Sequence, residues 1–239
     1  MNRTRRRGAV AIGVAVALLL SGCAAGAPAS TPTPTAEPTP APSAPVTPTA
    51  EPDPLTTVTA IVARPETIEL RDAAGVLVDE FSYLDDPVAV IGAITALLGT
   101  DPVSEDEPGH PHAPPNTAHR WEAFTLWEQR HADNWAHVEY SIFSPRFLVE
   151  FTGPSAFGVQ LTTAQGVQVG HSWADLLAEP GLETNVPCSG PYLDFVEIHG
   201  VDPDGGAYTA RVGVDFRPTA DEATVARVGA PIAVSGGCA

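Results

Sequence analysis

The sequence predicts an α+β domain built from two similar copies of a β-hairpin, an α-helix and an antiparallel β-meander, preceded by a disordered tether. Two apolar segments with a glycine near the turn, at 68–78 and 159–169, align without a gap. Each segment leads into a helix signal, and strand-like segments follow each helix. Antiparallel sheets that carry one helix each would bury the apolar faces of these elements.

Residues 1–22 have the composition of an export signal, because four arginines precede an apolar run at residues 8–20. This run is too short for a transmembrane helix, which needs about 20 apolar residues. The four residues Leu20-Ser21-Gly22-Cys23 resemble the lipobox of bacterial lipoproteins. The resemblance implies cleavage before Cys23 and a diacylglyceryl thioether on its sulfur. A secreted protein with an incidental Cys23 is the alternative, and the export route, Sec or twin-arginine, stays open.

A lipid-anchored tether is expected at residues 23–55. Residues 24–54 contain ten prolines and six threonines and almost no large apolar side chain, so they cannot form a core. At about 3.1 Å per residue, an extended polyproline chain of this length reaches roughly 95 Å. We therefore expect the folded part to stand clear of the membrane.

One folded domain is expected at residues 56–239, with repeat-like halves at about 57–153 and 154–239. It contains two cysteines, Cys188 and Cys238, and an even number of cysteines in an exported protein favours a disulfide. This bridge would close a loop of 51 residues. The chain-entropy model values such a loop at about 4 kcal/mol. Two free buried thiols are the alternative.

In the first half, the hairpin at 68–78 contains Gly75, which adopts positive φ at little cost. Asp86 caps the helix that follows, Pro87 suits its first position and Gly99 ends it. The apolar stripe of this helix consists of Val90, Ile94, Leu97 and Leu98. The expected strands are "HRWEAFTLWEQR" at 119–130, "WAHVEYSIF" at 135–143 and "RFLVEF" at 146–151.

In the second half, the hairpin at 159–169 contains Gly166 at the matching position. Ser172 caps a short helix, which Pro180 and Gly181 stop. The expected strands are "YLDFVEIHG" at 192–200, "AYTARVGVDF" at 207–216 and "TVARVGAPIAV" at 224–234.

Three segments follow the lipobox and the Thr/Pro-rich tether in a distinctive order: "TAIVARPETIELRDAAG", "HRWEAFTLWE" and "LTTAQGVQVGHSWADLLAEPG". In this order the chain resembles uncharacterised lipoproteins of actinobacteria over most of its length, a family that implies no particular activity. The shorter segment "VQVGHSWADLL" is similar to the glycine, small hydroxyl, helix pattern of duplicated helix-plus-meander folds such as the beta-lactamase inhibitory protein. That second resemblance implies a scaffold for binding.

The charge of the chain argues against one class of partner. The formal net charge is −17, and the chain contains no lysine. Removal of residues 1–22 takes away four of twelve arginines, which leaves 8 positive against 29 negative residues, a balance of −21. We therefore expect no binding to nucleic acid.

A cluster of histidines is the candidate metal site. His110, His112 and His119 are candidate ligands, with Glu105, Asp106 or Glu107 to supply oxygen. Pro111 forces an extended backbone between the first two histidines, and neither a cysteine nor a strict ligand spacing accompanies them. We therefore commit to no metal site here, and a solvated loop is the alternative.

Two further patterns have simple structural explanations. Asp202 and Asp204 stand before two glycines, as at the start of a calcium loop, but the later oxygen ligands are missing, which favours a hairpin turn. Glu197 and His199 alternate along one strand and are interpreted as a surface ion pair.

The sequence shows no catalytic signature. It contains no glycine-flanked serine elbow, no paired metalloprotease histidines and no phosphate-binding glycine loop. The lack of lysine excludes lysine-based catalysis. Carboxylate pairs of glycoside hydrolases come from distant positions without a local signature, so an enzyme stays an alternative.

Aromatic side chains are concentrated in the first half. On strands, about half of them are expected to point into the core. The rest are expected to form an interaction face for a protein or a glycan. These residues are Trp121, Phe124, Trp127, Trp135, Tyr140, Phe143, Phe147 and Phe151.

The sequence thus predicts a lipid-anchored protein on the extracytoplasmic face of the cell membrane. Its membrane contact is the lipid at Cys23, and its folded part is a non-catalytic binding domain without a cofactor. The partner is a protein or a cell-wall glycan. The alternatives are an extracellular metal-capturing protein that uses the His110–His137 region and a cell-wall-processing enzyme.

Overall fold

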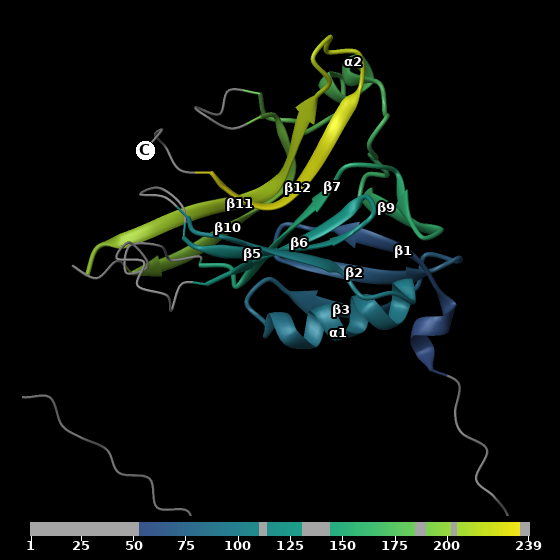
Figure 1. Cartoon of the computed structure of the whole chain (residues 1–239). Coiled ribbons are helices and arrows are strands. Elements are labelled where there is room, and N and C mark those ends of the chain that lie inside the picture. The colour runs from purple at the N-terminus through teal and green to yellow at the C-terminus, as the bar shows by residue number, and fades with distance from the viewer. Residues whose placement is uncertain (1–52, 110–113, 131–143, 185–189, 202–204, 235–239) are drawn as a thin grey trace, which may run out of the picture. The chain divides into compact units, whose positions relative to one another are not determined.

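The computed structural model describes residues 53–109, 114–130, 144–184, 190–201 and 205–234. Within these residues the protein is mainly β, with two sheets and two α-helices, so the predicted α+β class is confirmed (Figure 1). A short 3-10 helix, η1 (Pro54–Thr57), stands at the predicted start of the folded domain.

The smaller sheet has five strands in the order β3-β2-β1-β9-β8. β1 and β9 run parallel, whereas the other neighbours run antiparallel. Strands from both predicted halves therefore share this sheet. The bounds are β1 Val58–Ala63, β2 Thr67–Asp72, β3 Leu77–Ser82, β8 Ser155–Ala156 and β9 Val159–Thr163.

The larger sheet has seven antiparallel strands in the order β10-β11-β12-β7-β6-β5-β4. β12 pairs with β7, which joins the meander of the second half to the strands of the first half. The bounds are β4 Val103–Glu107, β5 Asn116–Trp121, β6 Phe124–Gln129, β7 Phe147–Phe151, β10 Tyr192–Val201, β11 Ala207–Pro218 and β12 Val225–Val234.

The strand predictions for the second meander are confirmed, but those for the first need correction. The segment 119–130 does not form one strand but parts of two, β5 and β6. A turn connects them, and in this turn Glu122 has a φ of 48°. The segment 135–143 lies outside the described residues, and β7 matches the last prediction. β4 was not predicted, because its sequence "VSEDE" has no apolar alternation. Charged side chains suit it as an edge strand, since they discourage further pairing.

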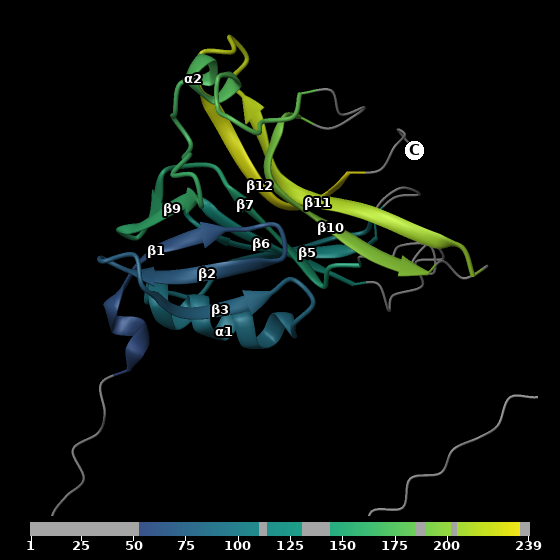
Figure 2. The ribbon, with the colours of Figure 1, turned by 180° about the vertical axis from the view of Figure 1, so that it is seen from behind.

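Both predicted helices form. α1 (Pro87–Leu98) is capped by Asp86, whose carboxylate accepts from the Val88 amide at 3.1 Å, and it ends at Gly99. It lies beside β3 in both views (Figures 1 and 2). α2 (Trp173–Leu177) is capped by Ser172, whose hydroxyl accepts from the Asp175 amide at 3.3 Å. These caps satisfy backbone donors that have no partner inside the helix.

The two aligned segments share one turn but not a second strand. In the first, the Gly75 amide donates to the Asp72 carbonyl at 2.9 Å; in the second, the Gly166 amide donates to the Thr163 carbonyl at 3.0 Å. The two glycines have φ of 78° and 79°. After the second turn, residues 167–169 form no strand, so that part of the hairpin prediction is wrong. The chain instead turns toward β12, where the Gly170 amide donates to the Val225 carbonyl at 2.8 Å.

One core cluster joins both sheets and both helices. It includes four of the aromatic residues that the sequence singled out, Trp121, Phe124, Phe147 and Phe151, all at most 1% exposed. The centroid of the Phe124 ring lies 5.7 Å from the ring centroid of Trp121 and 5.7 Å from that of Phe151. Burial of each such side chain stabilises the fold by about 1.5–3 kcal/mol.

Candidate functional site

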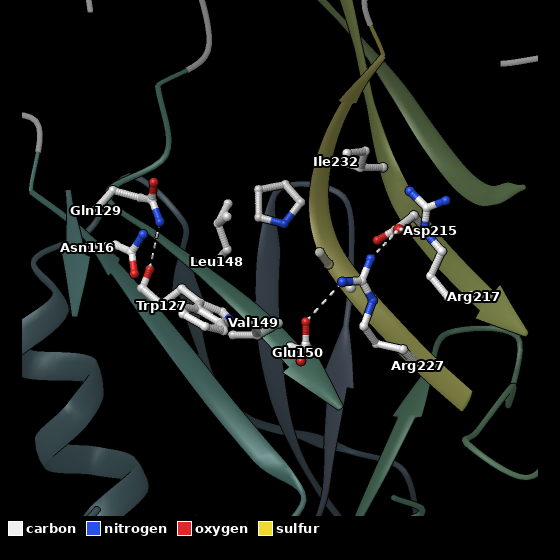
Figure 3. Close-up of a pocket in the computed structure, with 13 residues that line it drawn as sticks. Asn116, Trp127, Gln129, Leu148, Val149, Glu150, Asp215, Arg217, Arg227 and Ile232 are labelled. Carbon is white, nitrogen blue, oxygen red and sulfur yellow. Dashed lines mark hydrogen bonds and ion pairs between the residues drawn. The ribbon is translucent and has the colours of Figure 1, made fainter. Parts of the chain in front are cut away.

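A groove of about 500 Å³ lies on the face of the seven-stranded sheet that is turned away from the core, over β5, β6, β7, β11 and β12 (Figure 3). It extends past the point where β12 and β7 stop pairing. Their pairing ends at Ala230 and Val149, and the next residue of β12 is Pro231, which has no amide hydrogen for a strand ladder. Pro231 and Leu148 both line the groove at this point.

One end of the groove carries a network of four charged side chains. Arg227 donates to Glu150 at 3.1 Å and to Asp215 at 3.2 Å. Arg217 lies on the other side of Asp215, with its Nε 3.6 Å from the carboxylate. Gly229 stands directly across from Asp215 in the β11–β12 ladder, and a Cβ there would overlap the Asp215 carboxylate. The glycine therefore makes room for the acid.

Asp215 is only 4% exposed. Burial raises the pKa of Asp215, because the charged form loses its hydration, and Arg227 and Arg217 lower this pKa only in part. Loss of hydration thus outweighs the attraction of the two arginines. Buried acids of this kind are found at functional sites as well as in structural ion-pair networks.

The other end of the groove is formed by Trp127, Asn116 and Gln129 (Figure 3). The guanidinium of Arg120 lies 5.3 Å from the centre of the Trp127 ring and makes a cation–π contact with the indole. The Asn116 Oδ1 atom is buried and has no hydrogen-bond partner in the described part of the chain, and the same holds for Arg227 Nε. A buried polar atom without a partner costs free energy, so a ligand that bonded to it would relieve that cost.

A second polar cluster joins Glu183 to Tyr192 of β10 and Arg211 of β11. Arg211 binds both carboxylate oxygens of Glu183, at 2.6 and 2.9 Å, and Tyr192 donates to the same carboxylate at 2.6 Å. The Arg211 and Tyr192 hydrogen bonds lower the pKa of Glu183, whereas burial and Glu183 raise the pKa of Tyr192 to about 12. Arg211 also lies 3.8 Å from the centre of the Phe195 ring. The carboxylate of Glu183 and the terminal nitrogens of Arg211 are paired with each other, which favours a structural role, although Arg211 Nε is buried without a hydrogen-bond partner in the described part of the chain.

His119, one of the three metal candidates, lies on β5 and faces the core side of the sheet, next to Trp121. Its Nδ1 lies 2.9 Å from Ser104 Oγ and its Nε2 lies 3.1 Å from Glu128 Oε2. Both ring nitrogens thus contact side chains of neighbouring strands. His110 and His112 lie outside the described residues. Within the described residues, no three His, Cys, Asp or Glu side chains lie close enough together to hold a metal ion.

This Ser104–His119–Glu128 chain has the order of a nucleophilic triad, but the groove lies on the opposite face. Asn116 and Trp127 line the groove, whereas Thr117, His119 and Glu128 alternate to the other side. The geometry therefore links β4, β5 and β6 without bringing Ser104 to the groove.

The remaining predicted residues have mixed outcomes. Cys23, Cys188, Cys238, Asp202 and Asp204 lie outside the described residues, as do the aromatic residues Trp135, Tyr140 and Phe143. His199 contacts Thr209 across the β10–β11 ladder, at 3.0 Å. In the described part of the chain, neither α1 nor α2 has the length and apolarity to cross a bilayer.

The sequence-based reasoning missed Asp215, Arg227 and Pro231. No local signal marked Asp215 as buried, because on an alternating strand a charge between the core residues Val214 and Phe216 indicates a solvent-facing position, whereas residues 212–216 are all buried. Comparisons of the chain with protein-family models, with curated proteins and with solved structures find no match.

Proposed function

We propose that this chain is a lipid-anchored extracytoplasmic surface protein whose folded domain binds a partner, without catalysis, in the groove of the seven-stranded sheet. The lipobox at Cys23 and the Thr/Pro-rich tether support the location. The groove carries the binding part of the proposal, because it combines an apolar wall with a few oriented polar groups, as ligand sites usually do.

The absence of catalysis is proposed from the position of Arg227. A glycosidase needs two carboxylates that face each other across the bond to be cleaved. Here Arg227 lies between Glu150 and Asp215 and binds both (Figure 3). The arginine occupies the space where a scissile bond would lie, and it ties both acids into ion pairs.

The proposal of two similar copies is supported by the shared turn around Gly75 and Gly166, with matching hydrogen bonds and φ. In this proposal, the second copy has exchanged its outer hairpin strand for the contact between Gly170 and Val225. A helix and antiparallel strands follow each turn.

The anchor and the groove are tested separately. Mass spectrometry of the native protein is expected to show an N-terminus at Cys23 with a lipid on the sulfur. An intact N-terminus or an unmodified Cys23 thiol would contradict the location.

For the groove, the full chain with Cys23→Ser is incubated with isolated cell envelopes of the producing cells and sedimented. We expect it to sediment with the envelopes, and Trp127→Ala to reduce the bound fraction by about tenfold, as loss of a central aromatic contact commonly does. Phe157→Ala, at an exposed aromatic residue outside the groove, is the matched control. Equal sedimentation of all three chains would refute binding through the groove.

A further inference from the structure

Among the described residues that line the groove, positive and negative charges are balanced, which restricts the charge of its ligand. Glu150 and Asp215 are negative, Arg217 and Arg227 are positive, and each is within 3.6 Å of an opposite charge in the network. A charged ligand would leave one unmatched charge beside the buried Asp215, where the loss of hydration makes it costly. The ligand that fits is therefore neutral.

The polar side chains at the two ends of the groove define its hydrogen bonding. The amides of Asn116 and Gln129 donate and accept at one end, whereas the guanidinium of Arg227 only donates at the other. A ligand that spans the groove must therefore offer acceptors at both ends and a donor at the first. Hydroxyl groups do both, because each has one hydrogen and two lone pairs.

The wall between these two ends is apolar. Trp127, Leu148 and Ile232 line it, and the flat Trp127 ring, which Arg120 contacts, offers a large contact area. A sugar ring has the complementary structure, with C–H groups on its faces and hydroxyl groups around its rim.

Resting on the binding function proposed above, we propose that the groove binds a neutral saccharide, with a sugar face on Trp127 and hydroxyl groups on Asn116 and Arg227. This assigns the partner to the glycan class. An acidic peptide or another anion would be attracted by Arg217 and Arg227 but repelled by Glu150 and Asp215, so its charge would find no net partner in the groove.

The test is titration calorimetry on the full-length protein in a detergent without a sugar headgroup. The probes are four neutral trisaccharides, N-acetylated chitotriose, cellotriose, maltotriose and mannotriose, together with triglutamate as an anionic probe. We expect at least one trisaccharide to bind with a Kd of about 1 mM or tighter, and triglutamate not to compete.

Two variants locate the binding. Trp127→Ala and Asn116→Ala are each expected to weaken the trisaccharide by about fivefold or more, and Phe157→Ala to leave the Kd unchanged. Thermal unfolding of each variant checks that it folds. The proposal is overturned if no trisaccharide binds, if triglutamate binds more tightly, or if both variants bind like the unmodified protein.

The two proposals fail in different ways. If no trisaccharide binds but the sedimentation with envelopes depends on Trp127, the saccharide assignment is wrong and the binding function stands. If the sedimentation is also independent of Trp127, both are wrong.

Discussion

Replacing glycine by alanine at two positions should change the stability in opposite directions. Gly92 is exposed in the middle of α1, and a Cβ there would meet no atom within 4 Å. Gly190 is buried just before β10, and a Cβ there would overlap the Phe216 carbonyl oxygen, a backbone atom of β11. The same chemical change therefore adds helix propensity at one site and a steric overlap at the other.

The magnitudes follow from these surroundings. In a helix interior, alanine is favoured over glycine by about 0.8–1.0 kcal/mol, so Gly92→Ala should raise the free energy of unfolding by this amount. At Gly190 the overlap involves the backbone, which cannot move aside as a flexible side chain can, and overpacking of this kind costs about 1–3 kcal/mol or more. A change of 1 kcal/mol shifts the Tm of a domain of this size by about 2–4 °C.

Urea unfolding of the full-length protein, followed by circular dichroism, measures both changes. The midpoint should rise for Gly92→Ala and fall for Gly190→Ala, with the denaturant slope unchanged. A Gly190→Ala protein as stable as the unmodified one would refute the close approach of residue 190 to β11. That approach matters for the groove, because β11 carries Asp215.

Three further outcomes are expected. Gly75→Ala and Gly166→Ala should each cost about 1–2 kcal/mol in urea unfolding, because both glycines have positive φ in open surroundings; costs that differ by more than about 1 kcal/mol would show that the two turns are not equivalent. Burial raises the pKa of Asp215 above its unfolded value of about 3.9, so between these two pKa values the folded state binds more protons and the free energy of unfolding falls as the pH rises. Asp215→Asn should remove this pH-dependent decrease in the free energy of unfolding, and urea unfolding of the unmodified and variant proteins between pH 3 and 8 measures it. If the two free energies differ by the same amount at every pH, the raised pKa is contradicted. Tyr192→Phe should cost about 0.5–1.5 kcal/mol in thermal unfolding, because Glu183 loses one hydrogen bond but keeps Arg211; no loss at all would mean that this bond adds nothing to the stability.

Local signals predicted the helices and most strands. The cap at Asp86 and the end at Gly99 each depend on a few neighbouring residues, so both could be placed from the sequence. Core residues recur at every second position in β11, at Val212, Val214 and Phe216, and this period is also local. β4 could not be predicted, because its side chains are mostly exposed and its strand conformation depends on pairing with β5.

The groove could not be predicted in the same way. Asp215 and Glu150 are 65 positions apart in the chain, and they meet at Arg227 only because β12 pairs with β7 on one side and β11 on the other. The sequence indicated aromatic residues for an interaction face, but it could not say that Trp127 faces the groove while Trp121 is buried. One residue of strand register separates these two outcomes.

The sequence by itself determined the α+β class, the caps of both helices, the two glycine turns and the strands of the second meander. These features depend on contacts within a few residues, where backbone preferences and side-chain period act directly. The tertiary structure decided which strands of the two halves share a sheet, where the second hairpin ends, and that Pro231 and Asp215 line one groove. Those features depend on strand pairing between distant segments, and many pairings satisfy the same local pattern until one core packs them all.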